Sequence, residues 1–355
     1  MSLSDIIQQA WRTRGALTLC LLPLAGIFAL LSALRRLAYR RGWLPSERLP
    51  VPVVVVGNIT VGGSGKTPLT LWLAQQLQQA GRRPGIVSRG YAAQSNQRQA
   101  HEACEVHADS DALQVGDEPL LLKRRSGLPL FVGRDRVAAA RALLAAYPEC
   151  DLILSDDGLQ HYRLARDVEI ALLDGRGLMN GWPLPAGPLR EPAWRLAHVD
   201  ALVLNGDDAQ VPVSAEATGV PAFRMRLAGT SFYRLDDPAQ VCAAHDLGKL
   251  RLAAVAGIAV PQRFFAHLAG LGLTFTRHAF PDHHHFSADD FSAIDADALL
   301  ITEKDAVKCT GFSQRPVWVL PVTAQVEPLS SGAAAGLAAH VQHCIEEKLL
   351  GRPSA

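Results

Sequence analysis

Residues 53–68 read VVVVGNITVGGSGKTP and combine two local signals. The four valines at 53–56 are typical of a strand that is buried on both faces. The glycines that follow let backbone N–H groups curl around phosphates without Cβ clashes, and the N-terminus of a following helix adds partial positive charge. A strand, a glycine-rich turn and a helix in this order predict a phosphate-binding P-loop, whereas the plainer alternative is a βα turn without a ligand.

The predicted nucleotide contacts come from the loop and from the start of its helix. Lys66 is expected to reach the β- and γ-phosphates, and the Thr67 hydroxyl is expected to bind Mg²⁺. The loop departs from the general pattern G-x-x-x-x-G-K-[ST], because Thr60 stands at the first glycine position. The backbone at the start of this loop must therefore differ from that of a P-loop with the general pattern. The complete predicted set is Thr60, Gly62, Gly63, Ser64, Gly65, Lys66 and Thr67.

A P-loop also needs a carboxylate on the metal side, at the end of another buried strand. Residues 152–158 read LILSDDG and supply two. Asp156 is the first candidate for Mg²⁺, directly or through water, and Asp157 is the second. The alternative is a turn that only closes the strand.

The nucleotide is predicted to be ATP rather than GTP. A GTPase normally carries N-K-x-D for the guanine base, and the nearest candidate here is TEKD at residues 302–305. The spacing from lysine to aspartate is wrong in that stretch. ATP is therefore favoured.

Strand-like runs alternate with helical patterns along most of the chain. This alternation predicts an α/β fold with a doubly wound, mostly parallel sheet, and a polar stretch at 207–221 predicts a boundary before a second, smaller α/β domain. The length of 355 residues also favours two globular units. We expect a membrane anchor at 1–40, a P-loop kinase domain at 41–215, a linker at 216–245 and the smaller domain at 246–355.

Residues 15–34 form a run of twenty residues without a charge. A helix of that length spans roughly 30 Å, the thickness of the hydrocarbon core, so we expect a single N-terminal transmembrane helix in which Pro23 is tolerated. A cleavable signal peptide fits poorly, because Arg35 and Arg36 follow the run directly. A hydrophobic hairpin or a buried core helix is the alternative. Four arginines follow the run and two precede it, which predicts that the rest of the chain is cytoplasmic.

The overall charge and the cysteines exclude several classes of protein. A net charge of +1 gives no long-range attraction to nucleic acid, so no nucleic-acid partner is expected. The six cysteines are scattered without a C-x-x-C pair, which argues against a zinc site or a disulfide framework. We interpret them as packing residues in a reducing compartment.

Phosphoryl transfer to a hydroxyl needs a group that takes up its proton. Asp117 lies in the sequence GDEP before an apolar helix, and His283 lies in PDHHH in the second domain. Taken alone, Asp117 is more often a helix cap, and the histidine run is a solvated loop or an adventitious metal site.

Together these motifs resemble the tetraacyldisaccharide 4′-kinase family of lipid A biosynthesis. The resemblance rests on TVGGSGKTP (60–68), SRGY (88–91), GDEP (116–119), GRDR (133–136), DDGLQH (156–161), GPLREP (187–192), PDHH (281–284) and TEKDAVK (302–308). It implies ATP- and Mg²⁺-dependent phosphorylation of the 4′-hydroxyl of a tetraacylated glucosamine disaccharide 1-phosphate, which yields lipid IVA. It also implies an inner-membrane protein whose active site faces the cytoplasm, with two α/β/α domains that close over the nucleotide and no obligate protein partner.

The resemblance also assigns roles to individual residues. Asp117 matches the general base of the family, and His283 matches the histidine paired with it. Asp156 and Asp157 match the metal-side motif. Four further residues match motifs that line the family's cleft: Gln160, His161, Arg190 and Glu191.

The sequence departs from the family pattern at two places and leaves other interpretations open. Ala92-Ala93 and Ala259-Val260 replace glycine-containing turns. Residues 178–184, with Trp182, form either an interfacial segment beside the acyl chains or a buried loop. Lys304 is expected to make a structural contact at the domain interface. The rival functions are a membrane-associated P-loop ATPase that drives a protein partner and a non-catalytic nucleotide-binding scaffold.

Overall fold

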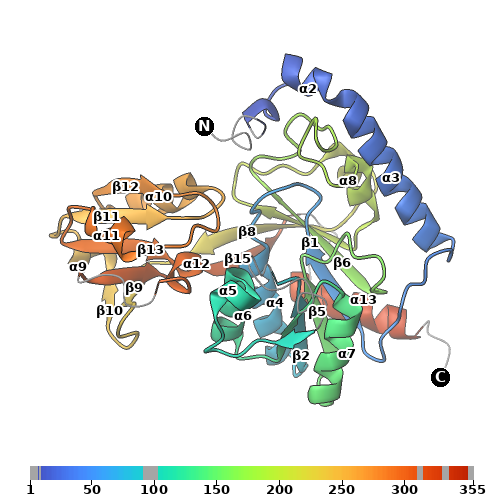
Figure 1. The fold of residues 1–355 in the computed structure, drawn as a ribbon. Coiled ribbons are helices and arrows are strands. Elements are labelled where there is room, and N and C mark those ends of the chain that lie inside the picture. The colour runs from blue at the N-terminus through green and yellow to red at the C-terminus, as the bar shows by residue number, and fades with distance from the viewer. Residues whose placement is uncertain (1–6, 8, 91–102, 310–314, 330–335, 351–355) are drawn as a thin grey trace.

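The computed structural model describes residues 7, 9–90, 103–309, 315–329 and 336–350. Ala92 and Ala93, where the sequence departs from the family pattern, lie outside this part of the chain, as does Tyr91 of the SRGY motif. The described strands form two sheets, one of nine strands and one of six (Figure 1).

The larger sheet is parallel from β8 to β4, and its two edge strands are antiparallel. The P-loop strand lies in the middle, between the strands that end at Asp156 and Asp174. In spatial order the strands are β15 (Thr323–Pro328), β8 (Ala222–Ala228), β7 (Ala201–Asn205), β6 (Val168–Asp174), β1 (Val53–Gly57), β5 (Leu152–Asp156), β2 (Pro84–Ser88), β4 (Leu130–Val132) and β3 (Cys104–Glu105).

Helices cover both faces of this sheet, which confirms the predicted doubly wound fold. Val54 and Val56 face one core and Val53 and Val55 face the other, because successive side chains of a strand point to opposite faces. This explains why the valine run is continuous. One face packs against α4 (Lys66–Gln79), α6 (Asp117–Ser126) and α13 (Leu337–Leu350), and the other against α7 (Arg136–Ala146), η2 (Ala193–His198) and α8 (Val213–Glu216).

The smaller sheet is mixed, with a parallel half that resembles the larger one in construction. Its cores lie on both faces, against α10 (Pro261–Gly270) on one side and α11 (Ala288–Ser292) and α12 (Glu303–Ala306) on the other. The strand order is β10 (Val241–Ala243), β9 (Ser231–Arg234), β14 (Val317–Leu320), β13 (Ala298–Thr302), β11 (Leu252–Ala256) and β12 (Phe275–Ala279). Two short helices, α5 (Ala112–Val115) and α9 (Ala244–Leu247), complete the described elements that follow the N-terminal region.

The chain crosses between the two sheets twice. The regions expected as linker (216–245) and as smaller domain (246–355) therefore each contribute elements to both sheets. β8 belongs to the larger sheet and β9 to the smaller one, although both lie within 216–245. β15 and α13 return to the larger sheet, so residues 246–355 do not form one unit. The two crossings touch: a Cβ placed on Gly229 would lie 2.2 Å from the carbonyl oxygen of Pro321, so only glycine fits there.

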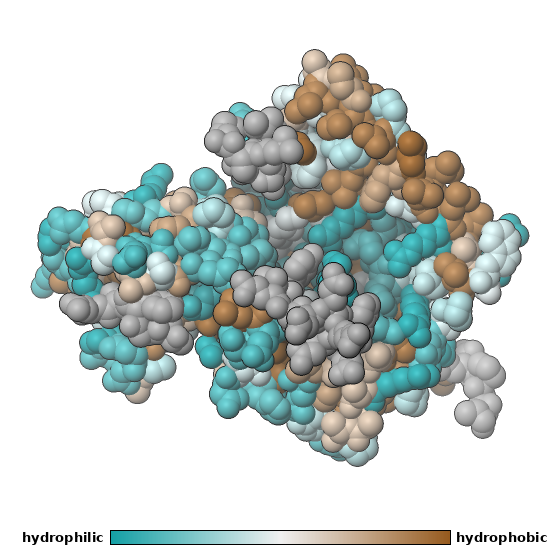
Figure 2. Space-filling model, in the orientation of Figure 1, coloured by the Kyte–Doolittle hydropathy of each residue, from teal (hydrophilic) through white to brown (hydrophobic). Residues whose placement is uncertain are grey.

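The apolar N-terminal run is divided at Leu21 into α2 (Ala16–Cys20) and α3 (Leu22–Arg40), where one helix over 15–34 was expected. Pro23 lies in the first turn of α3, because proline has no N–H to continue the preceding helix. Within the described residues, α3 is the one helix long and apolar enough to cross a membrane. Apolar side chains gather over α2 and α3 in Figure 2, among them Leu17, Leu24, Ile27, Leu30, Leu31 and Leu34.

Several contacts hold the N-terminal region on the larger unit. The Arg36 guanidinium stacks 3.9 Å from the ring centre of Trp194, and the Tyr39 and Tyr162 rings lie 6.0 Å apart. Arg14 lies over Trp182 at 5.4 Å, so the segment 178–184 packs beside the N-terminal helices. One side of α3 therefore faces protein and the other presents leucines.

Candidate functional site

The side chain of Asn58 shapes the P-loop. It is fully buried directly after β1, and its Nδ2 donates to Ser64 Oγ at 3.1 Å and to the carbonyl oxygen of Gly62 at 3.4 Å. Thr60 Oγ1 lies 3.4 Å from the same amide nitrogen. The loop is thus held by an asparagine amide that also contacts Thr60, the residue at the position where the general pattern has its first glycine.

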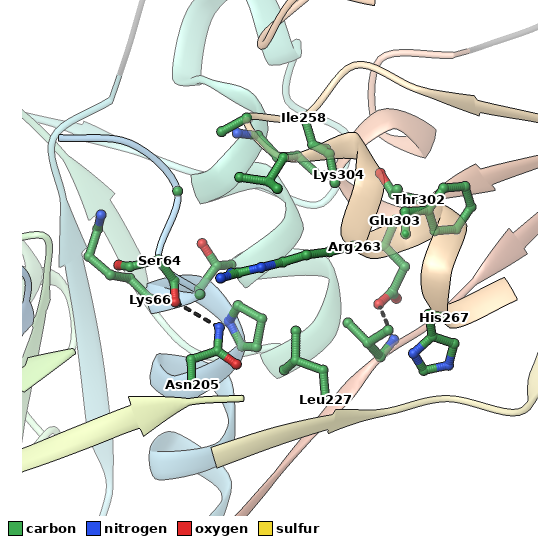
Figure 3. A pocket seen from close by; sticks show the side chains of 18 of the residues that line it. Ser64, Lys66, Asn205, Leu227, Ile258, Arg263, His267, Thr302, Glu303 and Lys304 are labelled. Carbon is green, nitrogen blue, oxygen red and sulfur yellow. Dashed lines mark hydrogen bonds between the residues drawn. The ribbon is translucent and has the colours of Figure 1, made fainter. Parts of the chain in front are cut away.

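Gly65 turns the loop into α4. Its φ is +98°, and an added Cβ would lie 2.5 Å from Asn205 Nδ2. That amide donates to the carbonyl oxygen of Ser64 at 2.8 Å, from the end of β7, which β6 separates from β1 (Figure 3). Glycine is therefore required by both the backbone conformation and the close packing.

Lys66 is the first residue of α4 and lies among oxygens at the loop. Its Nζ is 3.4 Å from Asn58 Oδ1 and 3.6 Å from Asp157 Oδ1. Arg190 approaches the same Asp157 carboxylate at 3.4 Å. Burial alone would raise the pKa of Asp157, but the positive charges of Lys66 and Arg190 lower it. Asp157 is therefore ionised and paired with two cations.

Asp156 ends β5 with 1% of its surface exposed. Its oxygens accept hydrogen bonds from Thr70 Oγ1 at 3.1 Å and from Ser88 Oγ at 3.4 Å. Burial, together with the charges of Glu118 and Asp157, raises its pKa to about 7. Carboxylate and hydroxyl oxygens are the hard ligands that Mg²⁺ prefers, so the chemistry of Thr67, Asp156 and Asp157 suits that ion. The threonine hydroxyl that contacts Asp156 is that of Thr70, and the predicted set of Thr67, Asp156 and Asp157 stays a prediction.

The structure brings Asp117 and His283 together across the two sheets. Asp117 opens α6 on the larger sheet, and His283 follows β12 on the smaller one. His283 Nδ1 lies 2.9 Å from Asp117 Oδ2. The residue that caps α6 is Gly116, and the Asp117 carboxylate is 6% exposed within the chain. Asp117 Oδ1 also accepts a hydrogen bond from the backbone N–H of Glu118 at 3.0 Å, so the carboxylate contacts the start of α6 as well as His283.

Lys304 adds a positive charge to this pair. Its Nζ contacts Glu118 at 3.0 Å, Asp282 at 3.2 Å and Asp117 at 3.9 Å, which confirms the expected contact at the interface. Burial would raise the pKa of Asp117, but the hydrogen bond with His283 and the charge of Lys304 lower it to about 2. The same hydrogen bond raises the pKa of His283 above its usual 6.5, against the opposing effects of burial and Lys304.

The four residues predicted to line the cleft lie on the Asp157 side of the loop. Gln160 Nε2 donates to the Asn58 carbonyl at 3.0 Å and to Glu191 at 2.9 Å, so these two residues brace the loop from behind. Glu191 is 5% exposed and also accepts a hydrogen bond from Tyr162. His161 lies 3.8 Å from Asp135, and burial lowers its pKa to about 4, with Arg136 nearby. Arg190 is the member of this set that faces Asp157.

A cavity of about 430 Å³ opens between the P-loop and the smaller sheet (Figure 3). The loop and the start of α4 form one wall, and the start of α10 and the crossing strands form the other. Its lining includes four residues that the sequence prediction missed: Asn205, Ile258, Arg263 and His267. The position of Asn205 at the end of a predicted strand was the one signal available for them, since ligands bind at the carboxyl ends of parallel strands.

A second ion pair joins the two units that carry the sheets. Arg125 Nη1, near the end of α6, lies 2.6 Å from both carboxylate oxygens of Glu303, which is 7% exposed. Because Arg125→Met removes the cation paired with this buried carboxylate and leaves it the N–H of Val322, we expect the free energy of unfolding to fall by about 1–3 kcal/mol. Urea denaturation of the full chain measures this change. Arg124→Met, which removes a contact to a backbone carbonyl, is the control, and an equal loss in both variants would contradict the pairing.

The chain is similar to known proteins over nearly its whole length. A tetraacyldisaccharide 4′-kinase of Azoarcus sp. (strain BH72) is 52% identical over 345 residues, covering 97% of this chain and 96% of the relative. That of Chromobacterium violaceum is 54% identical over 331 residues, covering 91% and 95%. The crystal structure of LpxK from Aquifex aeolicus in complex with ATP superposes with a TM-score of 0.76 at 29% identity, covering 93% and 99%. The tetraacyldisaccharide-1-P 4′-kinase family model matches residues 17–341, and the chain belongs to this family.

Proposed function

We propose that the chain transfers the γ-phosphate of ATP to the 4′-hydroxyl of tetraacyldisaccharide 1-phosphate, in the synthesis of lipid IVA. The observation that carries this proposal is the Asp117–His283 pair, which joins the units of the two sheets. Lys304, which contacts Asp117 at 3.9 Å, and Glu118 also line the cavity at the P-loop. An ATPase that drives a protein partner needs the loop but has no acceptor hydroxyl to deprotonate.

In the proposed reaction Asp117 accepts the proton of the acceptor hydroxyl. The hydroxyl oxygen forms a bond to the γ-phosphorus while the bond from this phosphorus to the bridging oxygen breaks, so ADP leaves and the sugar becomes a phosphate ester. A carboxylate with a pKa near 2 is a weak base, but loss of the His283 proton makes the pair more basic. His283 positions Asp117 and shares the proton.

The P-loop holds the other reactant. Backbone N–H groups of the loop bind the phosphates, and Lys66 neutralises negative charge on the transferring group. Thr67 and Asp156, with Asp157 nearby, would hold Mg²⁺, which supplies further charge neutralisation when bound. Asp157 and Asn58 keep the ammonium group of Lys66 at the loop.

We also propose that the smaller sheet closes on the larger one about the two crossings at Gly229 and Pro321. Asp117 and His283 belong to different sheets, so this closure assembles the pair. The requirement limits ATP hydrolysis in the open form.

The apolar face of α2 and α3 supports a location at the inner membrane. We propose that these helices anchor the chain there with both sheets on the cytoplasmic side, because the arginines at 35, 36, 40 and 41 follow the apolar run. The lipid substrate then meets the site without leaving the bilayer. Vesicle flotation of the full chain and of a Leu24→Asp/Leu31→Asp variant measures this, and equal flotation would contradict it.

The Asp117–His283 pair predicts a pH dependence of turnover. The pair accepts a proton when His283 is neutral, and the pKa of His283 is raised above 6.5. We therefore expect kcat to rise with pH through a transition above 6.5, and we expect His283→Gln to remove that transition. Turnover measured from pH 5.5 to 9 at saturating substrates shows this. The same transition in His283→Gln would assign it to another group.

A further inference from the structure

Two arginines, one from the unit of each sheet, contact Asp174 beside the P-loop. Asp174 ends β6, next to the P-loop strand, and its side chain is 3% exposed. Arg176 lies in the turn that follows β6, and Arg263 comes from the first turn of α10, which packs on the smaller sheet.

The two arginines hold Asp174 unequally. Arg176 binds it through Nε at 3.0 and 3.1 Å and through Nη2 at 2.8 Å, and the same Nη2 donates to the Gly63 carbonyl at 3.0 Å. Arg263 reaches the shared carboxylate through Nη2 at 3.2 Å, with 39% of its side chain exposed. Arg176 therefore helps to hold the loop through the Gly63 carbonyl. Arg263 makes the longer contact with Asp174, and its exposed side chain has space to change conformation.

Arg263 is also aimed at the phosphate loop. It lines the cavity together with Gly63, Ser64, Lys66 and Thr67, and Figure 3 shows its guanidinium extending across that cavity toward Ser64. The turn that leads into α10 packs directly on the loop, because the Ala259 Cβ lies 3.2 Å from the place of a Cβ on Gly63. A nucleotide triphosphate held by the loop would therefore lie within the space that the guanidinium enters.

We propose that Arg263 binds the polyphosphate of ATP and that Asp174 holds this arginine in position when phosphate is absent. This inference rests on the proposed ATP-dependent function. The planar guanidinium donates two parallel hydrogen bonds to phosphate oxygens, and ATP offers more negative charge than a carboxylate already shared with Arg176. Nucleotide binding then transfers Arg263 from Asp174 to the phosphates.

This transfer ties the smaller sheet to the nucleotide. α10 and His283 belong to the same unit, so an arginine bound to phosphate also holds His283 against Asp117. Arg263, from the unit of the smaller sheet, thus binds the ATP that the P-loop of the larger sheet holds. In this way it couples ATP binding to the assembly of the Asp117–His283 pair.

The test compares the full chain with Arg263→Gln by the rise in Tm that ATP and Mg²⁺ produce and by the KM for ATP. Because ligand that binds the folded state raises Tm with affinity, we expect the ATP-dependent rise to be largely lost and KM to increase about tenfold or more. The Tm without nucleotide should change little, since Arg176 still holds Asp174. Arg263→Lys keeps the positive charge but loses the planar guanidinium. Its ATP-dependent rise in Tm should lie between those of the unaltered chain and Arg263→Gln, and it replaces the glutamine variant if that variant does not fold.

Arg277→Gln is the matched control, because Arg277 lies on β12 of the same sheet and stacks near Phe265 at 6.0 Å. Its ATP-dependent rise in Tm should equal that of the unaltered chain. An unchanged rise in Arg263→Gln, or a loss confined to the Tm without nucleotide, would overturn the proposal and leave Arg263 a structural residue. These binding readouts need no lipid, so an unaltered chain that binds ATP but fails to phosphorylate lipid would instead contradict the proposed function.

Discussion

Asp117→Asn is expected to lower kcat for lipid phosphorylation by ~10²–10⁴-fold, the usual contribution of a positioned general base. The amide keeps the size of the side chain but cannot accept the proton of the acceptor hydroxyl. His283 also loses the carboxylate that raises its pKa. Steady-state turnover with saturating ATP and lipid measures the loss.

Two controls separate this chemistry from damage to the fold. The ATP-dependent rise in Tm should be kept in Asp117→Asn, because the P-loop is intact in that variant. Asp111→Asn changes a carboxylate that caps the neighbouring helix α5, and it should leave kcat within a few-fold. Turnover by Asp117→Asn at the rate of the unaltered chain would show that another group takes up the proton.

Lys66→Met is expected to lower kcat/KM for ATP by ~10²–10³-fold, the scale found when one preorganised charge or donor is removed from a transition state. The methionine fills the space of the side chain but leaves the phosphates without the ammonium group. In the structure this group lies between Asn58 and Asp157, so it is already placed at the loop before nucleotide binds.

The exposed Lys249→Met is the control for Lys66→Met, and it should leave both kinetic constants unchanged. Initial rates over a range of ATP concentrations provide the comparison. If Lys66→Met lost no more than Lys249→Met, the loop would not be the site of phosphoryl transfer.

The larger sheet could be predicted because its signals are local. The valines of β1 favour a buried strand, and the glycines of the loop favour a tight turn, without reference to distant residues. The alternation of strands and helices then predicts a doubly wound sheet. The return of β15 and α13 to that sheet could not be predicted, since an apolar pattern does not say which of two sheets a strand joins. The division of the N-terminal run at Leu21 could not be predicted, because a proline is compatible both with the interior of one membrane span and with the first turn of a new helix, where Pro23 lies.

The site could be predicted only in part, for a similar reason. Lys66 and Thr67 belong to one local motif, but Asp117 and His283 are 166 residues apart, and their pairing was implied by the family resemblance. Asn58 carries no general signal, although its amide holds the loop that starts at Thr60. Lys304 contacts the carboxylates of Asp117 and Glu118 on one unit and of Asp282 on the other. The residues around Lys304 in the sequence predict only that a helix begins there.

The most direct test of the proposed function is transfer of labelled γ-phosphate from ATP to purified tetraacyldisaccharide 1-phosphate in detergent micelles. The position of the new phosphate is then determined by NMR of the product. We predict a product phosphorylated at the 4′-hydroxyl, formed by the unaltered chain and nearly lost in Asp117→Asn. Absence of lipid phosphorylation by a folded chain that binds ATP, with hydrolysis stimulated by a protein and not by the glycolipid, would contradict it.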